Sequence, residues 1–201
     1  MSPSPDSPAV SDCRSRLVQA ATEAFIAEGY RVCVDRIAAQ AGVAKQTLYN
    51  HFPSKADLFA EVTRQATAEF MIALGEDSDG LRGRLRRFGV RYRERLLSPV
   101  GLGLYRMLVA EAPRFPELAA TFYEAGPRRT MERLRVLLLE AMECGELRRE
   151  DPEFAVSQLL AMLANERNCL LFSNEPLPEP DPAQAERIVD CFLRAFAPQR
   201  P

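Results

Sequence analysis

Apolar side chains recur along this chain at intervals of three and four residues, and no long stretch alternates between apolar and polar residues. Intervals of three to four place side chains on one face of an α-helix, whereas alternation indicates a β-strand. One such stripe runs from Leu17 to Phe25 and ends before Gly29, a residue type that often ends helices. The pattern predicts an all-α fold of nine or ten helices.

Proline, glycine and capping residues predict where the helices begin and end. The segment from Ser54 to Asp57 resembles a capping box at a helix start, and Gly126-Pro127 must break or kink a helix. Asp151-Pro152 and Asp181-Pro182 each combine an N-cap with a proline in the first turn. The last two helices are therefore expected at residues 152–173 and 182–196, joined by an extended proline-rich linker.

The overall charge gives no sign of a nucleic-acid partner, because the formal net charge is -2 and a basic excess is absent. Any such function must rest on local features. Residues 1–10 have no cationic start followed by an apolar stretch, so they predict a flexible tail and not a secretory signal. Polar residues at 165–168 interrupt the most apolar stretch, so no membrane span is expected. We expect a cytoplasmic protein.

No motif in the sequence indicates catalysis, a metal site or a cofactor. The five cysteines include no C-x-x-C pair, which favours reduced thiols over zinc ligands or disulfides; a thiol redox sensor is the alternative. The single histidine is His51, and neither a nucleophile elbow nor a phosphate-binding loop is present. We expect a protein that is not an enzyme, although an α-helical enzyme without a recognisable motif is a rival hypothesis.

The segment at residues 35–55, DRIAAQAGVAKQTLYNHFPSK, fits a helix-turn-helix. Gly42 supplies the residue that a tight turn needs, since glycine readily adopts a positive φ. Leu48 and Phe52 lie four residues apart and should both face the core. Helical geometry then turns the polar residues between them outward.

That outward set suits the major groove of DNA. A lysine can donate to guanine, and glutamine or asparagine can pair with adenine through two hydrogen bonds. Hydroxyl, imidazole and ammonium groups suit phosphate oxygens. The candidate DNA-binding residues are Lys45, Gln46, Thr47, Tyr49, Asn50, His51, Lys55 and Arg36. The residues alone leave open a second interpretation, in which two short packed helices merely expose polar side chains to solvent.

A resemblance favours the first interpretation. Residues 14–62 resemble the DNA-binding domain of the tetracycline-repressor (TetR) family, above all in the run V-A-K-Q-T-L-Y-N-H-F-x-x-K. Residues 110–130 resemble the C-terminal domain of an AefR-type subgroup. The resemblance implies a three-helix DNA-binding domain at residues 11–56 and a larger C-terminal bundle at residues 57–201. It further implies a transcriptional repressor that binds a palindromic operator in double-stranded DNA as a homodimer.

The sequence departs from the family pattern at three positions. Family members usually carry threonine or serine just before the second helix, where this chain has Val32 and Cys33. Serine is also frequent where Ala44 stands, so the third helix lacks an N-cap side chain, at a cost of about 1 kcal/mol. These departures weaken any expectation of backbone phosphate contacts at these positions.

The resemblance also assigns roles to the C-terminal bundle, although plain core packing is an alternative for every residue concerned. It implies that the last two helices form a four-helix dimer interface, with candidates Leu159, Leu163, Leu170, Ile188, Val189, Phe192 and Phe196. It implies a pocket for a small apolar or aromatic effector that releases DNA. Candidates for the pocket lining are Phe88, Tyr92, Tyr105, Met107, Phe122, Tyr123 and Met162.

An arginine-rich run at residues 82–95 could bind an acidic ligand or phosphates, but a solvated, ion-paired helix face is the favoured interpretation. A helical interaction module that has lost DNA binding is a further alternative. Four outward residues argue against it: Lys45, Gln46, Thr47 and Tyr49.

Overall fold

The computed structural model describes residues 8–75, 80–172, 179 and 181–198 of the 201-residue chain. Within these ranges the regular secondary structure consists of eleven α-helices, which confirms the predicted all-α fold but exceeds the expected nine or ten helices. The helices are α1 (Pro8–Glu28), α2 (Val34–Gln40), α3 (Lys45–His51), α4 (Lys55–Gly75), α5 (Gly80–Leu96), α6 (Pro99–Glu111), α7 (Pro116–Ala125), α8 (Pro127–Glu143), α9 (Pro152–Leu163), α10 (Arg167–Phe172) and α11 (Pro182–Ala195).

The predicted helix starts are confirmed by their capping contacts. The hydroxyl of Ser54 accepts the backbone N–H of Asp57 at 3.1 Å and donates to the Asp57 carboxylate at 2.7 Å. Asp151 and Asp181 accept backbone N–H groups two residues later, at 3.0 Å and 2.9 Å. Gly126 separates α7 from α8, as Gly126-Pro127 predicts.

The prediction of one helix over residues 152–173 is wrong, because α9 ends at Leu163 and α10 begins at Arg167. The guanidinium of Arg93 donates to the carbonyl of Leu163 at 2.9 Å and to the carboxylate of Glu166 at 2.8 Å. A side chain thus occupies the carbonyl that a continuous helix would offer to the N–H of Arg167. The predicted linker lies almost wholly outside the described residues. So do residues 1–7 of the predicted tail, and α1 begins at Pro8.

Two compact units divide the chain, one formed by Met1–Gln65 with Gly103–Ala125 and the other by Ala66–Leu102 with Gly126–Pro201. We call them the N-terminal and C-terminal units. This grouping differs from the expected division after residue 56, because α4 and α6 each contribute residues to both units. It also places α7 with the N-terminal helices.

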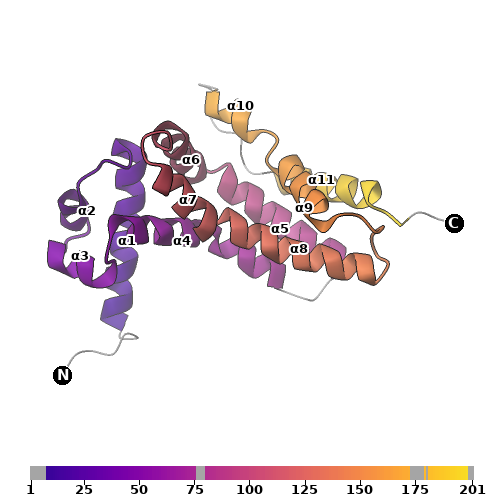
Figure 1. Ribbon diagram of the computed structural model, residues 1–201, viewed down its shortest axis with the longest axis horizontal. Helices are drawn as coiled ribbons and strands as arrows, with labels where there is room; N and C mark the ends of the chain where they lie inside the picture. The colour runs from indigo at the N-terminus through magenta and orange to yellow at the C-terminus, as the bar shows by residue number, and fades with distance from the viewer. Residues whose placement is uncertain (1–7, 76–79, 173–178, 180, 199–201) are drawn as a thin grey trace. The chain divides into compact units, whose positions relative to one another are not determined.

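The N-terminal unit is built around an aromatic cluster. Phe25 and Phe59 are almost fully buried with ring centres 5.5 Å apart, and the ring of Tyr30 lies 5.7 Å from each of them. Phe115, which precedes α7, packs on Tyr30 at 5.4 Å, which is one reason why residues 103–125 group with the N-terminal helices. Figure 1 shows α2 and α3 beside α1 within this unit.

The C-terminal unit has its own core between α5, α8, α9 and α11, where α5 packs on α9 and α11 and α9 packs on α8 and α11 (Figure 1). Phe88 and Phe192 are fully buried there, together with leucines from α8 and α9. Gly89 lets the helices approach closely, since a Cβ atom on it would lie 3.2 Å from Leu163 Cδ2. Among the described residues no helix is both long and apolar enough to span a bilayer.

Candidate nucleic-acid interface

The turn between α2 and α3 has the geometry that Gly42 predicts. Its φ is +68°, in the left-handed region that glycine tolerates best. The N–H of Val43 donates to the carbonyl of Ala38 at 3.0 Å, and the N–H of Gly42 donates to that of Ala39 at 3.1 Å. This pair of hydrogen bonds is a Schellman motif, which ends α2 and redirects the chain into α3.

The orientation of α3 is confirmed by its burial. Leu48 is fully buried and Phe52, just after the helix, is 2% exposed, so both anchor α3 to the core as predicted. Lys45, Gln46, Tyr49 and Asn50 are exposed, and Thr47 and His51 are partly exposed. The α3 helix therefore presents one continuous polar face, which we call the α3 face.

Neither helix of the pair has a side-chain N-cap. Ala44 precedes α3 and Cys33 precedes α2, and neither side chain bonds to the backbone of the helix that follows. The expected lack of a cap at Ala44 is confirmed. The orientation of α3 therefore depends on its anchoring residues and on the turn.

The ammonium of Lys45 is already engaged by a carboxylate within the chain. Its Nζ lies 3.0 Å from both oxygens of Asp35, which stands in the first turn of α2. The hydrogen bond with Lys45 is the main cause that lowers the pKa of the Asp35 carboxyl, and the same bond raises the pKa of Lys45. Sequence reasoning missed this pair, because the turn alone brings residues ten positions apart together.

Three more candidate residues have partners in the N-terminal unit. Arg36 pairs with Glu28 at 2.5 Å, and the amide of Gln46 donates to the side-chain oxygen of Asn50 at 3.1 Å. The second contact joins adjacent turns of α3 and aligns two amide groups on its face. The Arg36 pair places a carboxylate beside a predicted cation, a partner that no sequence signal indicated.

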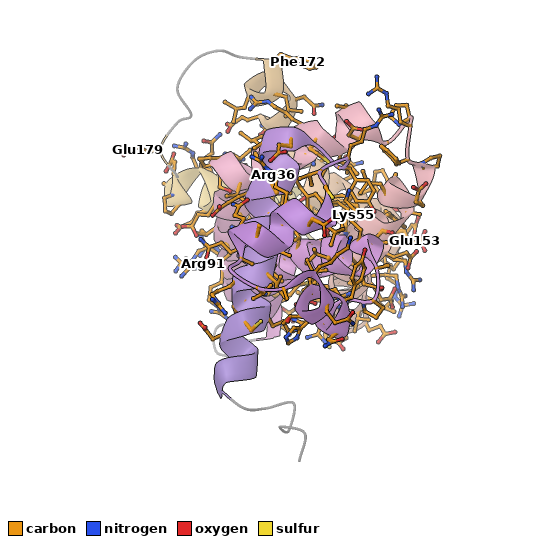
Figure 2. All side chains as sticks on the ribbon, turned by 90° about the vertical axis from the view of Figure 1, so that its left-hand side faces the viewer. Arg36, Lys55, Arg91, Glu153, Phe172 and Glu179 are labelled. Carbon is orange, nitrogen blue, oxygen red and sulfur yellow. The ribbon has the colours of Figure 1, made fainter. Side chains whose placement is uncertain are left out.

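Lys55 is placed differently from its predicted role at phosphates. It opens α4 and is half-buried, and its Nζ donates to the backbone carbonyl of Val32 at 2.6 Å. The same ammonium lies 4.8 Å from the ring centre of Tyr30, a cation–π distance. Burial lowers the pKa of Lys55. Figure 2 labels this residue and Arg36, which stands on α2.

A cluster of charged side chains from α1 and α4 contacts Phe52, the residue that follows α3. The guanidinium of Arg14, on α1, lies 5.0 Å from the ring centre of Phe52 and donates to the carboxylate of Glu61 at 2.7 Å. Arg64 binds the same carboxylate at 2.8 Å. The hydrogen bond from Arg14 is the main cause that lowers the pKa of Glu61, with Arg64 contributing. These supporting residues were not predicted, since charged residues on α1 and α4 carry no distinguishing spacing.

Comparison with known proteins settles the family. The family model described as bacterial regulatory proteins of the tetR family matches residues 17–62. The model described as the C-terminal domain of AefR-like transcriptional repressors matches residues 83–198, more than half of the chain. The chain belongs to the TetR family. It is a DNA-binding transcriptional regulator and not an enzyme, since the members of this family are transcription factors.

Solved structures of other TetR-family regulators resemble this one over nearly its whole length. A regulator from Mesorhizobium loti is 29% identical with a TM-score of 0.74, covering 95% of this chain and 97% of its own. The flavonoid-responsive regulator FrrA is 31% identical with a TM-score of 0.71, covering 94% and 100%. A sequence match of shorter extent is to the activator FasR of Mycolicibacterium smegmatis, which is 43% identical over 53 residues. These are 26% of this chain and 24% of that protein.

The residues predicted for the dimer interface of this TetR-family regulator lie mostly inside one chain. Leu159, Leu163 and Phe192 are fully buried, Val189 is 1% exposed and Phe196 is 4% exposed. A side chain that exposes no surface in one chain has none to bury against a second. Leu170 and Ile188 are partly exposed. If α9 and α11 pair with a second copy, their exposed residues must supply most of the contact.

The residues predicted for the effector pocket are divided between the two units. Phe88, Tyr92 and Met162 belong to the C-terminal unit, where Phe88 is fully buried and stacks on Tyr92 at 5.3 Å. The others, Tyr105, Met107, Phe122 and Tyr123, belong to the N-terminal unit, so a shared pocket stays a prediction. A cavity of about 520 Å³ in the C-terminal unit is lined by other residues, including Arg93, Glu166 and Gln184.

The arginine run on α5 forms ion pairs within the C-terminal unit. Arg82 binds Asp190 of α11 at 2.7 Å, and Arg86 lies 3.2 Å from Glu186 of the same helix. Arg93 is buried against Glu166, as described above. These contacts support the structural interpretation of the run over a phosphate-binding one.

Proposed function

We propose that this TetR-family regulator is a ligand-responsive repressor, which binds a palindromic operator as a homodimer in the cytoplasm and is released by a small apolar or aromatic effector. The observation that carries the proposal is the α3 face, a continuous set of polar side chains held outward by the buried Leu48 and Phe52. A seven-residue helix of this kind fits the major groove.

The side chains of α3 suggest how the bases are read. Gln46 and Asn50 have amide groups that can pair bidentately with adenine, and Lys45 can donate to N7 and O6 of guanine. The partly exposed Thr47 and His51 and the exposed Tyr49 suit phosphate oxygens at the edge of the groove. Base contacts would set the preferred sequence, and phosphate contacts would fix the register.

The short length of α3, seven residues, is the reason to propose a homodimer. One short helix reaches only a few base pairs, whereas two copies set roughly 34–36 Å apart read both halves of a palindrome. Apolar side chains available for pairing include Phe154, 46% exposed on α9, and the partly exposed Ile188 on α11. If the subunits assemble through α9 and α11, replacing Phe154 or Ile188 by a polar residue should weaken both dimerisation and operator binding.

The nature of the effector is suggested by a relative. FrrA, 31% identical over nearly the whole chain, is named as flavonoid-responsive. An aromatic effector of similar chemistry is therefore the first class to test here. Binding of the effector should change the free energy of operator binding by about 1–3 kcal/mol, the usual size of allosteric coupling.

The test is a gel shift over a range of salt concentrations, with the DNA upstream of the protein's own gene and a shuffled duplex. Gln46→Ala should lose about 1–3 kcal/mol on the upstream DNA alone. Gln19→Ala is the matched control, because Gln19 is exposed on α1 and its amide donates to Glu23 of the same helix. Equal binding of both duplexes by the wild type, or a monomer in sedimentation equilibrium, would contradict the proposal. Expression of a reporter gene placed behind the upstream DNA distinguishes repression from activation. FasR is named as an activator.

A further inference from the structure

The ion pair between Lys45 and Asp35 joins the two helices of the helix-turn-helix at the edge of the α3 face. Both carboxylate oxygens lie 3.0 Å from the ammonium, and both side chains are more than half exposed. The carboxylate also accepts the thiol of Cys33 at 3.4 Å. The Asp35 carboxylate is therefore positioned by the thiol of Cys33, and it fixes the position of the Lys45 ammonium.

The geometry leaves Lys45 able to bind DNA while it stays paired. An ammonium has three N–H donors, and two carboxylate oxygens occupy at most two of them. At least one donor is left for an acceptor on a base edge. The direction of that donor is set by the position of Asp35 instead of by the flexible four-carbon stem of lysine.

A free lysine on this face would behave differently. It is a mobile point charge that interacts with any phosphate along the duplex, and phosphate contacts carry no sequence information. Pairing with Asp35 reduces the rotamer freedom that Lys45 would lose on binding, and it places a negative charge where a phosphate would otherwise approach. Both effects favour a base contact over a phosphate contact.

We propose that Asp35 is a specificity-determining residue of the DNA interface, whose carboxylate directs the ammonium of Lys45 to a guanine edge and away from phosphates. This inference rests on the proposed sequence-specific binding of DNA. It assigns to a residue of α2 a role in base reading that is exerted through α3.

The proposal makes Asp35→Asn a variant that binds DNA more tightly and less selectively. Freed Lys45 should add about one phosphate contact per subunit, which steepens the salt dependence of log K by roughly 0.9 for each contact. The ratio of affinities for selected and shuffled DNA should fall roughly tenfold, because a directed base contact is lost. Replacing the critical guanine by 7-deazaguanine, which lacks the N7 acceptor, should weaken wild-type binding and leave Asp35→Asn almost unaffected.

The experiment uses a duplex recovered by the full-length wild type from a randomised pool, and a shuffled duplex of the same composition. Lys45→Met and the double variant Lys45→Met with Asp35→Asn complete a mutant cycle. Glu23→Gln is the charge control, since Glu23 is exposed on α1 and the contacts of its carboxylate are with Gln19 and Gln40, not with a lysine. Unfolding midpoints are measured for each protein, and Asp35→Ser replaces Asp35→Asn if the latter is not folded.

Each outcome decides between hypotheses. Loss of selectivity with Asp35→Asn, absent from the Lys45→Met background and from Glu23→Gln, supports the proposal. If Asp35→Asn has the same effect in the Lys45→Met background, Asp35 acts by repelling phosphates directly, and the proposal is overturned. If Glu23→Gln has an equal effect, the cause is net charge, and the proposal is again overturned. An unchanged selectivity and salt slope in Asp35→Asn also overturns it while the wild type still prefers the selected duplex. If the wild type itself has no preference, the proposed function fails, and this inference with it.

Discussion

The ammonium of Lys55 donates a hydrogen bond to the backbone carbonyl of Val32 at 2.6 Å, and so fastens the start of α4 to the segment between α1 and α2. The ring of Tyr30, 4.8 Å away, covers the same ammonium. Because the contact satisfies a carbonyl outside any helix, it stabilises the approach of the chain to α2. The sequence suggested a phosphate contact for this residue, and the two roles lead to different predictions.

Replacing Lys55 by methionine separates these roles. Methionine keeps an apolar stem against Tyr30 but removes the donor, so the free energy of unfolding in urea should fall by about 1–2 kcal/mol. Lys45→Met, at an exposed ion pair, should change it by less than about 1 kcal/mol. Unchanged stability of Lys55→Met, combined with a salt slope for DNA reduced by about one unit, would instead assign Lys55 to a phosphate.

The turn at Gly42 gives a second prediction. A Cβ atom there would meet only the Arg16 guanidinium at 3.8 Å, so space is available and the positive φ alone opposes substitution. Gly42→Ala should lower the free energy of unfolding by about 1–2 kcal/mol. Gly42→Asn should lower it less, since asparagine adopts the left-handed region more readily. Equal effects of the two variants in urea unfolding would contradict this account.

The features that the sequence predicted well are those set by neighbouring residues. Helical periodicity, the aspartate caps and the glycine turn each depend on a few adjacent positions, and apart from the break between α9 and α10 each is found where it was expected. The outward direction of α3 follows in the same way, because Leu48 and Phe52 share one helix face. Local patterns therefore located α3 and its outward polar face, whereas the assignment of that face to DNA came from the family resemblance.

The features that the sequence did not predict depend on contacts between distant residues. The end of α9 at Leu163 is fixed by Arg93, 70 positions away in the chain. The ion pair of Lys45 depends on how the turn folds α3 onto α2. The burial of Leu159 and Val189 within one chain reflects the packing of α5, α9 and α11, and an apolar stripe looks the same whether it faces a core or a partner.

The ion cluster at Glu61 predicts a loss of stability in acid. The pKa of Glu61 is lowered in the folded chain by Arg14 and Arg64, so the unfolded chain binds the proton first as the pH falls. Its contribution is therefore present above the ordinary value of 4.5 and is lost as the pH falls through the lower folded value. The free energy of unfolding should therefore decrease as the pH falls below 4.5.

The variant Glu61→Gln isolates this contribution. Glutamine keeps the shape and can still accept a hydrogen bond from Arg14, but it does not titrate. Its free energy of unfolding should be lower than that of the wild type at neutral pH, and the two values should converge as the pH falls below 4.5 and Glu61 becomes protonated. Parallel curves for the two proteins, measured by urea unfolding at each pH, would assign the acid sensitivity to other carboxyl groups.

The close approach of α5 to α9 and α11 at Gly89 gives a prediction that depends on side-chain size. A Cβ atom at this position would lie 3.2 Å from Leu163 Cδ2 and 3.3 Å from Val189 Cγ2, tighter than ordinary contacts. Gly89→Ala gains about 0.5–1 kcal/mol of helix propensity, which these contacts offset, so its stability should stay within about 1 kcal/mol of the wild type.

A larger side chain has no such compensation. Gly89→Leu must displace Leu163 or Val189 within a close-packed core, and it should lower the free energy of unfolding by about 1–3 kcal/mol. Adding Leu163→Ala creates room beside it, so the double variant should lose less than the sum of the single losses. Because an additive result in this mutant cycle would mean that the two side chains do not compete for space, urea unfolding of the four proteins tests directly whether Gly89 is what allows the three helices to pack.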